Sequence, residues 1–143
     1  LDEDLLGLLR SCVEGSLADH KLRIRHEAAL GVVLAADGYP GSYPKGMEVS
    51  GISEAEALDA VRVFQAGTRY DNGRILANGG RVLCVTAMGE TLSAARTRAY
   101  EAMERISMPD SFCRRDIGSK GLEHLQSETV PGAERRVTPP QRS

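Results

Sequence analysis

Short apolar segments separated by glycine turns constrain the fold of this chain more than any other feature. Residues 28–36 are apolar on both faces, which is typical of a strand inside a sheet. Asn72-Gly73 is the residue pair that favours a type I′ hairpin turn. Further strand-like segments occupy 47–50, 61–66, 74–77 and 81–87. Because so few residues separate most of these segments, we expect the strands to pair antiparallel.

Helices are predicted on both sides of these strands. Thr91 can cap a helix over 91–106, whose apolar residues recur every three or four positions: Leu92, Ala95, Ala99, Met103 and Ile106. A shorter helix is predicted over 5–13, ending at Gly15, and a brief helical or turn segment over 53–60. We therefore expect an α+β fold: an antiparallel sheet or small barrel packed by one main helix, with an N-terminal helical arm.

The composition excludes two classes of partner. The chain has 143 residues, enough for one domain with a core of its own. Its formal net charge of −2 gives no field that would attract nucleic acid or an anionic membrane. The longest apolar run, 28–36, has about half of the roughly 20 residues that a membrane-spanning helix needs. We expect no nucleic-acid partner and no membrane partner.

The cysteines and histidines show no metal-binding pattern. The three cysteines are odd in number and show no Cys-x-x-Cys spacing, so neither a zinc site nor a disulfide framework is supported. Reduced thiols and a cytoplasmic location are expected. The histidines are also too scattered for a metal site. The residues concerned are Cys12, Cys84, Cys113, His20, His26 and His124.

The turn Asn78-Gly79-Gly80 followed by Arg81 is the strongest candidate for a ligand contact. Successive backbone N–H groups at a Gly-Gly turn can form an anion-binding nest, and the arginine offers a bidentate fork for phosphate or carboxylate. The alternative is a turn between strands, whose arginine points to solvent or pairs with an acid.

Two further segments carry candidate polar contacts. Tyr39, in the loop Gly38-Tyr39-Pro40-Gly41, could face a substrate, although such a sequence is also typical of a plain tight turn. The arginines at 114–115 could reach a ligand, or an arginine could pair with Asp116 and tie the segment down. We favour the ion pair, because this segment follows a helix and must pack back against it.

Four segments, taken in order, resemble the C-terminal domain of the phosphoribosylamine–glycine ligase family (glycinamide ribonucleotide synthetase), ATP-grasp enzymes of purine biosynthesis. The resemblance runs from about residue 25 to about residue 122, and its motifs are Gly-Tyr-Pro-Gly at 38–41, Phe-Gln-Ala-Gly-Thr at 64–68, Asn-Gly-Gly-Arg-Val-Leu at 78–83 and Cys-Arg-Arg-Asp-Ile-Gly at 113–118.

The chain departs from the family pattern at two positions. Asp37 stands where the family commonly has glycine, and aspartate tolerates a positive φ better than most residues do. Gln65 stands where the family commonly has histidine. Because glutamine does not titrate near neutral pH, a structural hydrogen bond is expected at Gln65 rather than acid–base chemistry.

The resemblance implies the activity of a larger enzyme. That enzyme joins glycine to 5-phosphoribosylamine with hydrolysis of ATP to ADP and phosphate, and makes glycinamide ribonucleotide. ATP and magnesium or manganese would be bound mainly by the upstream ATP-grasp domain, whose Arg-Phe-Gly-Asp-Pro-Glu signature is absent from this chain. We therefore assign no catalytic residue and no metal ligand here, and expect the chain alone to be inactive.

The resemblance also divides the chain into parts. Residues 1–27 correspond to the end of the ATP-grasp domain and a connector, and 28–122 to the C-terminal ligase domain. Residues 123–143 are expected to be a disordered tail, because 127–143 has three prolines and few apolar residues. A stand-alone, non-catalytic binding or assembly domain of the same fold is the alternative. In that case the apolar face of the first helix would seek another protein.

Overall fold

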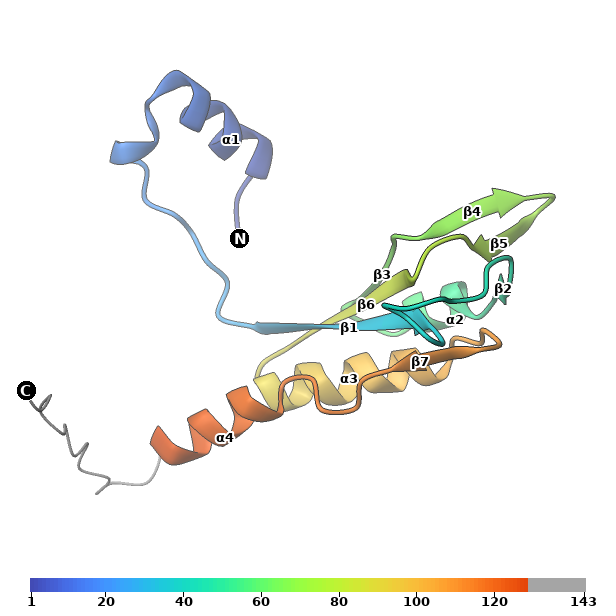
Figure 1. Ribbon diagram of the computed structural model, residues 1–143. Helices are drawn as coiled ribbons and strands as arrows, with labels where there is room; N and C mark the ends of the chain where they lie inside the picture. Colours follow the sequence, from blue (N-terminus) through green and yellow to red (C-terminus); the bar gives the residue numbers. More distant parts are fainter. Residues whose placement is uncertain (129–143) are drawn as a thin grey trace, which may run out of the picture.

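The computed structural model describes residues 1–128, which form an antiparallel sheet backed by one long helix, a second small sheet and a helical arm (Figure 1). In chain order the elements are α1 (Leu5–Glu14), the 3₁₀ turn η1 (Leu17–Asp19), β1 (Ala28–Ala36), β2 (Glu48–Val49), α2 (Ile52–Glu56), β3 (Val61–Gln65), β4 (Thr68–Asp71), β5 (Arg74–Ala77), β6 (Arg81–Gly89), α3 (Leu92–Glu104), β7 (Ser111–Cys113) and α4 (Ser119–Glu128). The predicted α+β class is confirmed.

Both sheets are antiparallel and open, so the sheet rather than the small barrel is correct. The main sheet has the strand order β3-β6-β1-β7, and the smaller sheet has the order β2-β5-β4. The predicted hairpin turn joins β4 to β5. Its central residues, Asn72 and Gly73, have φ angles of 48° and 84°. Positive φ at both positions is what a type I′ turn requires.

One face of the main sheet packs against α3 and forms the core (Figure 1). The helix residues predicted to face the sheet, Ala95, Ala99 and Met103, are buried. Small alanines allow the helix to lie close to the strands, and close packing maximises dispersion contacts. The buried strand residues opposite the helix include Leu30, Val32, Leu34, Val82, Leu83, Val85 and Ala87.

A β-bulge interrupts the pairing of the two central strands. Leu34 lies opposite Leu83, but the next residue, Ala35, lies opposite Arg81, so Val82 is an extra residue on β6. Strict alternation from Leu83 would turn Arg81 toward α3, since side chains two residues apart share a face. The bulge instead places Arg81 beside Ala35 on the face turned away from α3.

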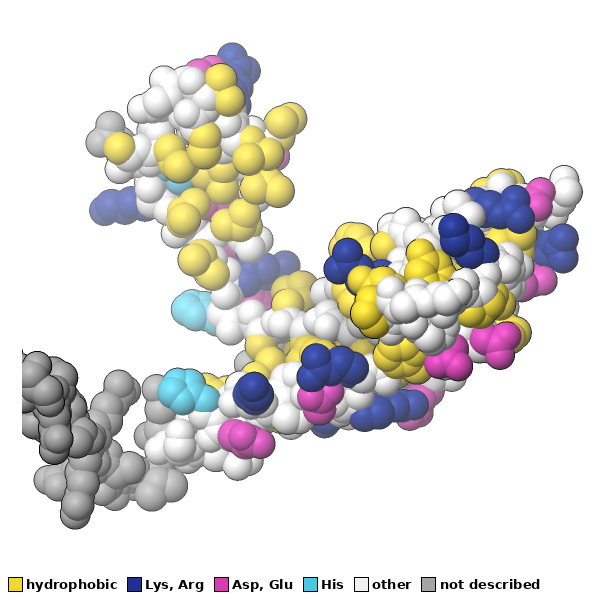
Figure 2. Space-filling view, viewed as in Figure 1, with side chains coloured by type: hydrophobic (Ala, Val, Ile, Leu, Met, Phe, Trp, Pro, Cys, Tyr) yellow, Lys and Arg dark blue, Asp and Glu magenta, His cyan; other side chains and the backbone are white. Residues whose placement is uncertain are grey.

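The N-terminal arm consists of α1, η1 and the extended segment 20–27, and it extends away from the sheets (Figure 1). Asp4 caps α1, accepting hydrogen bonds from the N–H groups of Leu6 (3.2 Å) and Gly7 (2.8 Å). Gly15 ends the helix with a φ of 73°, as predicted. Leu8 is buried in this arm, whereas other apolar side chains are exposed, and Figure 2 shows such side chains gathered over it. The exposed set includes Leu5, Leu6, Leu9 and Val13.

The elements η1, β4, β7 and α4 were not predicted from the sequence. The three-residue strand β7 was not predicted, because it is too short to show a period. Helix α4 continues to Glu128, so the predicted disorder is corrected for residues 123–128, and residues 129–143 lie outside the described part. A Cβ on Gly121 would stand 2.8 Å from Cδ2 of Leu92, a packing contact that residue periodicity cannot reveal. No helix within residues 1–128 is long and apolar enough to cross a membrane.

Candidate functional site

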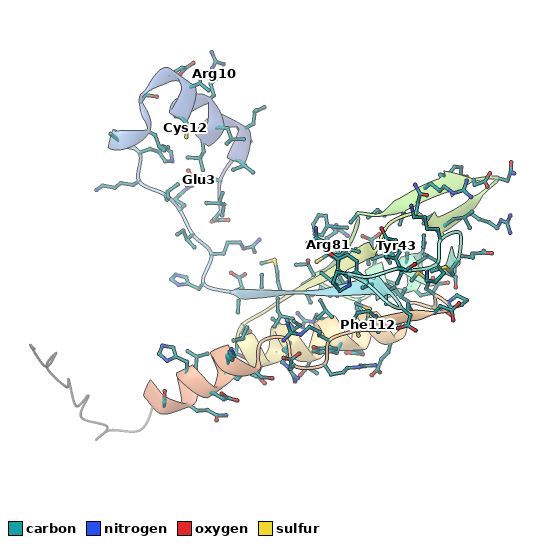
Figure 3. All side chains as sticks on the ribbon, viewed as in Figure 1. Glu3, Arg10, Cys12, Tyr43, Arg81 and Phe112 are labelled. Carbon is teal, nitrogen blue, oxygen red and sulfur yellow. The ribbon has the colours of Figure 1, made fainter. Side chains whose placement is uncertain are left out.

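A hollow of about 270 Å³ lies at one end of the main sheet, on the face turned away from α3. We call it the Arg81 hollow. Figure 3 labels Arg81 and Phe112 between the arm and the β4–β5 hairpin. The hollow combines an apolar floor with two guanidinium groups and a tyrosine on its rim. Its lining residues are Gly31, Val33, Ala35, Tyr39, Arg81, Phe112, Arg114 and Ile117.

Arg81 reaches this hollow because the bulge at Val82 turns it away from the core. Its side chain is exposed, and no carboxylate within residues 1–128 pairs with it. Within residues 1–128, Arg81 therefore does not form the ion pair with an acid that was one of the alternatives. An unpaired guanidinium retains its full charge and its planar fork of donors, which suits a phosphate or carboxylate.

Tyr39 lies in the loop that follows β1, and it lines both the Arg81 hollow and a neighbouring one of about 490 Å³. The ring packs against Gly80 and also meets the ring of Tyr43 edge-on, with 6.1 Å between the ring centroids. Gly38 has a φ of 86°, and the side chain of Asp37 accepts a hydrogen bond from its N–H at 3.0 Å. These contacts fix the conformation of the loop, which forms one wall of the hollow.

The turn at Asn78 and Gly79 does not form the anion-binding nest that its sequence suggests. The N–H groups of both residues donate to the carbonyl oxygen of Gly67, at 2.7 and 3.0 Å. These amides are therefore occupied within the protein. Gly67 and Gly79 approach so closely that a Cβ on Gly67 would stand 2.8 Å from Cα of Gly79. The glycines of this turn are needed for backbone packing behind Arg81.

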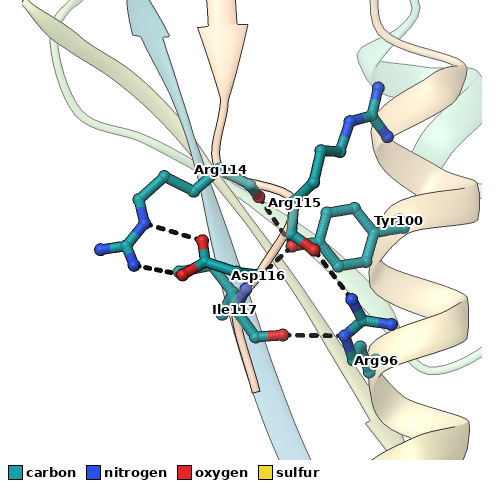
Figure 4. Close-up of polar contacts among 6 residues, drawn as sticks. All are labelled: Arg96, Tyr100, Arg114, Arg115, Asp116 and Ile117. Atoms are coloured by element: carbon teal, nitrogen blue, oxygen red, sulfur yellow. Dashed lines mark hydrogen bonds and ion pairs between the residues drawn. The ribbon is translucent and has the colours of Figure 1, made fainter. Parts of the chain in front are cut away.

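The segment 114–117 is tied to α3 by two helix side chains (Figure 4). Arg96 donates to the carbonyl oxygens of Ile117 (2.9 Å) and Arg115 (2.8 Å). Tyr100 donates its hydroxyl to the carbonyl of Arg114 at 2.7 Å and accepts from the N–H of Ile117 at 3.2 Å. These contacts hold Arg114 and Ile117 at the edge of the hollow.

The predicted ion pair between an arginine and Asp116 is also present. Arg114 Nε donates to Asp116 Oδ1 at 2.9 Å. This hydrogen bond from Arg114 lowers the pKa of the Asp116 carboxyl. Both side chains are exposed and only two residues apart, so the pair shapes the segment locally while Arg96 and Tyr100 tie it to the helix. Because Asp116 neutralises Arg114, Arg81 is the cation in this hollow that remains available to a ligand.

Gln65 makes the structural hydrogen bond expected of it. Its side-chain oxygen accepts from the hydroxyl of Thr68 at 2.9 Å, across the turn between β3 and β4. The three cysteines are free thiols. Within the described part of the chain, no group of three or more His, Cys, Asp or Glu side chains is placed to hold a metal ion.

Sequence reasoning missed the apolar residues of the hollow. Val33 and Phe112 come from strands that are distant in sequence, and β7 was not predicted at all. The antiparallel pairing of Ala35 with Phe112 brings them to one face. Alternation along 28–36 would have placed Val33 on the other face of the sheet from the core-facing Val32. Only knowledge of the neighbouring strand β7 shows that Phe112 lies on the same face as Val33.

Comparison with known proteins decides the family. Residues 29–120 match the family described as "Phosphoribosylglycinamide synthetase, C domain". The chain belongs to this family. The match contains β2 to β7, all of β1 except Ala28, and every lining residue of the Arg81 hollow.

Curated relatives and a solved structure agree with this assignment. The chain is 53% identical over 118 residues to a phosphoribosylamine–glycine ligase of Mesorhizobium japonicum, covering 82% of this chain and 28% of that protein. It is 50% identical over 116 residues to the Synechocystis ligase, covering 80% and 27%. The crystal structure of the Thermotoga maritima ligase matches with a TM-score of 0.62 and 34% identity, covering 77% of this chain and 27% of that chain. This domain thus spans just over a quarter of the relatives it matches.

Proposed function

We propose that this chain is the C-terminal part of a ligase that joins glycine to 5-phosphoribosylamine. In this reaction ATP phosphorylates the carboxylate of glycine, giving an acyl phosphate and ADP. The amine of phosphoribosylamine then attacks the acyl carbon, loses a proton and displaces phosphate, giving glycinamide ribonucleotide. The names of the relatives and the family match support this reaction.

The contribution we propose for this domain is to position phosphoribosylamine. The observation that carries the proposal is the unpaired Arg81 in a hollow built from the motifs of the family. Arg81 would bind the substrate phosphate through paired N–H donors, and Tyr39 would offer its hydroxyl at the rim. Asn78, Gly79 and Gly80 would contribute by shaping the backbone around Arg81. The apolar floor of Val33 and Phe112 would pack against the ribose.

The nucleotide chemistry would lie elsewhere in the complete enzyme. We propose that ATP and magnesium or manganese bind mainly to the upstream ATP-grasp domain. The described residues of this chain do not fit a divalent cation, since they contain no cluster of potential ligands. The free thiols are consistent with work in the reducing cytoplasm.

One observation favours a second candidate function, a stand-alone binding or assembly domain. The arm carries a row of exposed apolar side chains, including Leu5, Leu9 and Val13, which would suit contact with another protein. The ligase interpretation accounts for the same row by packing within the complete enzyme.

A reconstituted ligase tests the proposal. The matching C-terminal part of the Mesorhizobium japonicum relative would be replaced by this chain, and ADP formation would be measured with and without glycine and phosphoribosylamine. We expect ADP formation that requires both substrates, and none from this chain alone. A folded chimera without substrate-dependent ADP formation would favour the binding-domain alternative.

A further inference from the structure

The main sheet is covered on one face only. Helix α3 packs against the face that carries Val32 and Val85, whereas no described element covers the opposite face. We call this second surface the open face. Its residues are Ala29, Gly31, Val33 and Ala35 of β1, Arg62 and Phe64 of β3, Arg81, Cys84, Thr86 and Met88 of β6, and Phe112 of β7.

The open face is predominantly apolar. Phe64, Cys84 and Val33 lie side by side across three strands, and Phe112 lies beside Ala35 on the next rung. Phe64 is 58% exposed, Phe112 40% and Val33 38%. A continuous surface of this kind, with two exposed phenylalanines, is typical of a protein interface.

Small residues along β1 make the centre of the open face concave, so that side chains of another surface can pack into it. Ala29, Gly31 and Ala35 leave the centre low, and a Cβ on Gly31 would already stand 3.1 Å from Sγ of Cys84. Hollows of about 650, 490 and 270 Å³ lie along this face. The last of these is the Arg81 hollow, so whatever covers the open face also closes that hollow.

We infer that the open face docks the remaining part of the ligase, the portion of its relatives that this chain does not match. This inference rests on the proposed function. This chain covers 28% of the Mesorhizobium japonicum ligase, so most of that enzyme lies outside the matched region. The arm leaves β1 on the side of the sheet away from α3, which is the side of the open face (Figure 1). The rest of the enzyme would then carry an apolar patch that receives Phe64, beside the substrate held in the Arg81 hollow.

The charges on the open face disfavour a second copy of this chain as the occupant. Its strand residues include two arginines, Arg62 and Arg81, and no acid. Neither arginine has an ion-pair partner within residues 1–128. In a symmetric dimer the strands of each copy would present the same two unpaired arginines to the other, which costs electrostatic free energy. A different surface that carries a carboxylate opposite Arg62, beside an apolar patch, would be complementary and would leave Arg81 to the substrate.

Thiol footprinting tests this docking. Phe64→Cys and Tyr70→Cys would be made both in this chain alone and in the complete chimeric ligase, and their rates of reaction with iodoacetamide would be measured by mass spectrometry. Tyr70 is the matched control, because it is 77% exposed on the β4–β5 hairpin, outside the open face. Trypsin cleavage after Arg62, Arg69 and Arg74 separates the two sites into different peptides.

We expect Cys at position 64 to react at least about tenfold more slowly in the complete ligase than in the chain alone, since an interface core excludes solvent. The control at position 70 should react at similar rates in both, and native Cys84 should be protected together with position 64. Equal rates at position 64 in both proteins would overturn the inference. Protection in the chain alone, with sedimentation as a dimer, would assign the open face to a second copy and would also overturn it.

The same chimera separates this inference from the proposed function. Protection at position 64 without substrate-dependent ADP formation would support docking and reject the ligase activity. Substrate-dependent ADP formation without protection would support the activity and reject the docking.

Discussion

The ring of Tyr39 lies directly against Gly80, so closely that a Cβ atom on Gly80 would stand 2.1 Å from Cδ2 of the ring. This contact joins the loop after β1 to the turn before β6. It therefore sets the position of two walls of the Arg81 hollow, and it requires glycine at position 80.

Gly80→Ala is expected to lower the free energy of unfolding by about 1–3 kcal/mol, because the added methyl group overlaps the tyrosine ring. Urea denaturation measures this change. The same substitution in a Tyr39→Ala background should cost much less, since the overlapping ring is gone. An equal cost in both backgrounds would show that the contact with Tyr39 is not the cause.

Tyr100→Phe is expected to destabilise the protein by about 1–2 kcal/mol. The change removes one hydroxyl that serves two backbone groups, the carbonyl of Arg114 and the N–H of Ile117. Thermal or urea unfolding measures the effect, with the exposed neighbour Thr97→Ala as the control. Hydrogen exchange at the amide of Ile117 should accelerate in Tyr100→Phe alone. Unchanged exchange there would contradict the role of Tyr100 in holding this segment.

The arm should weaken in acid through Glu3. The N–H of Arg23 and the side chain of His20 both hydrogen-bond to the Glu3 carboxylate, each at 2.6 Å, and the pKa of Glu3 is lowered, chiefly by the Arg23 N–H. A lowered folded-state pKa means that the contribution to stability is present above the ordinary pKa of about 4.3 and is lost as the pH falls through the folded value.

Nuclear magnetic resonance measures this titration. The amide signal of Arg23 should shift with a midpoint below about pH 4.3. The shift should disappear in Glu3→Gln and persist in Glu14→Gln, which removes a different carboxylate of the same arm. A midpoint at or above the ordinary pKa of glutamate would contradict the hydrogen bonds from Arg23 and His20 to the Glu3 carboxylate.

Local sequence signals predicted most of the secondary structure for identifiable physical reasons. The glycine at Gly15 and the Asn72-Gly73 turn act within a few residues, so the sequence alone reveals them. The buried face of α3 followed from its 3.6-residue period. These signals do not depend on which strands become neighbours.

The site was less predictable because it depends on contacts between distant segments. Residues 78–81 were singled out correctly as a turn with an arginine, but the amides of Asn78 and Gly79 are occupied by Gly67, which lies eleven or more residues earlier. The bulge that turns Arg81 onto the open face arises from the pairing of β1 with β6. A single strand read by itself gives no sign of such a shift in register.

Arg81→Ala in the complete chimeric ligase tests the central claim most directly. We expect kcat/KM for phosphoribosylamine to fall at least about tenfold, as loss of a charge-assisted contact of roughly 1.5–3 kcal/mol predicts. The KM for ATP should be unchanged, and Arg74→Ala, which removes an exposed arginine of the hairpin, should behave as the parent. Unchanged kcat/KM for phosphoribosylamine in a folded Arg81→Ala enzyme would contradict a substrate site at this hollow.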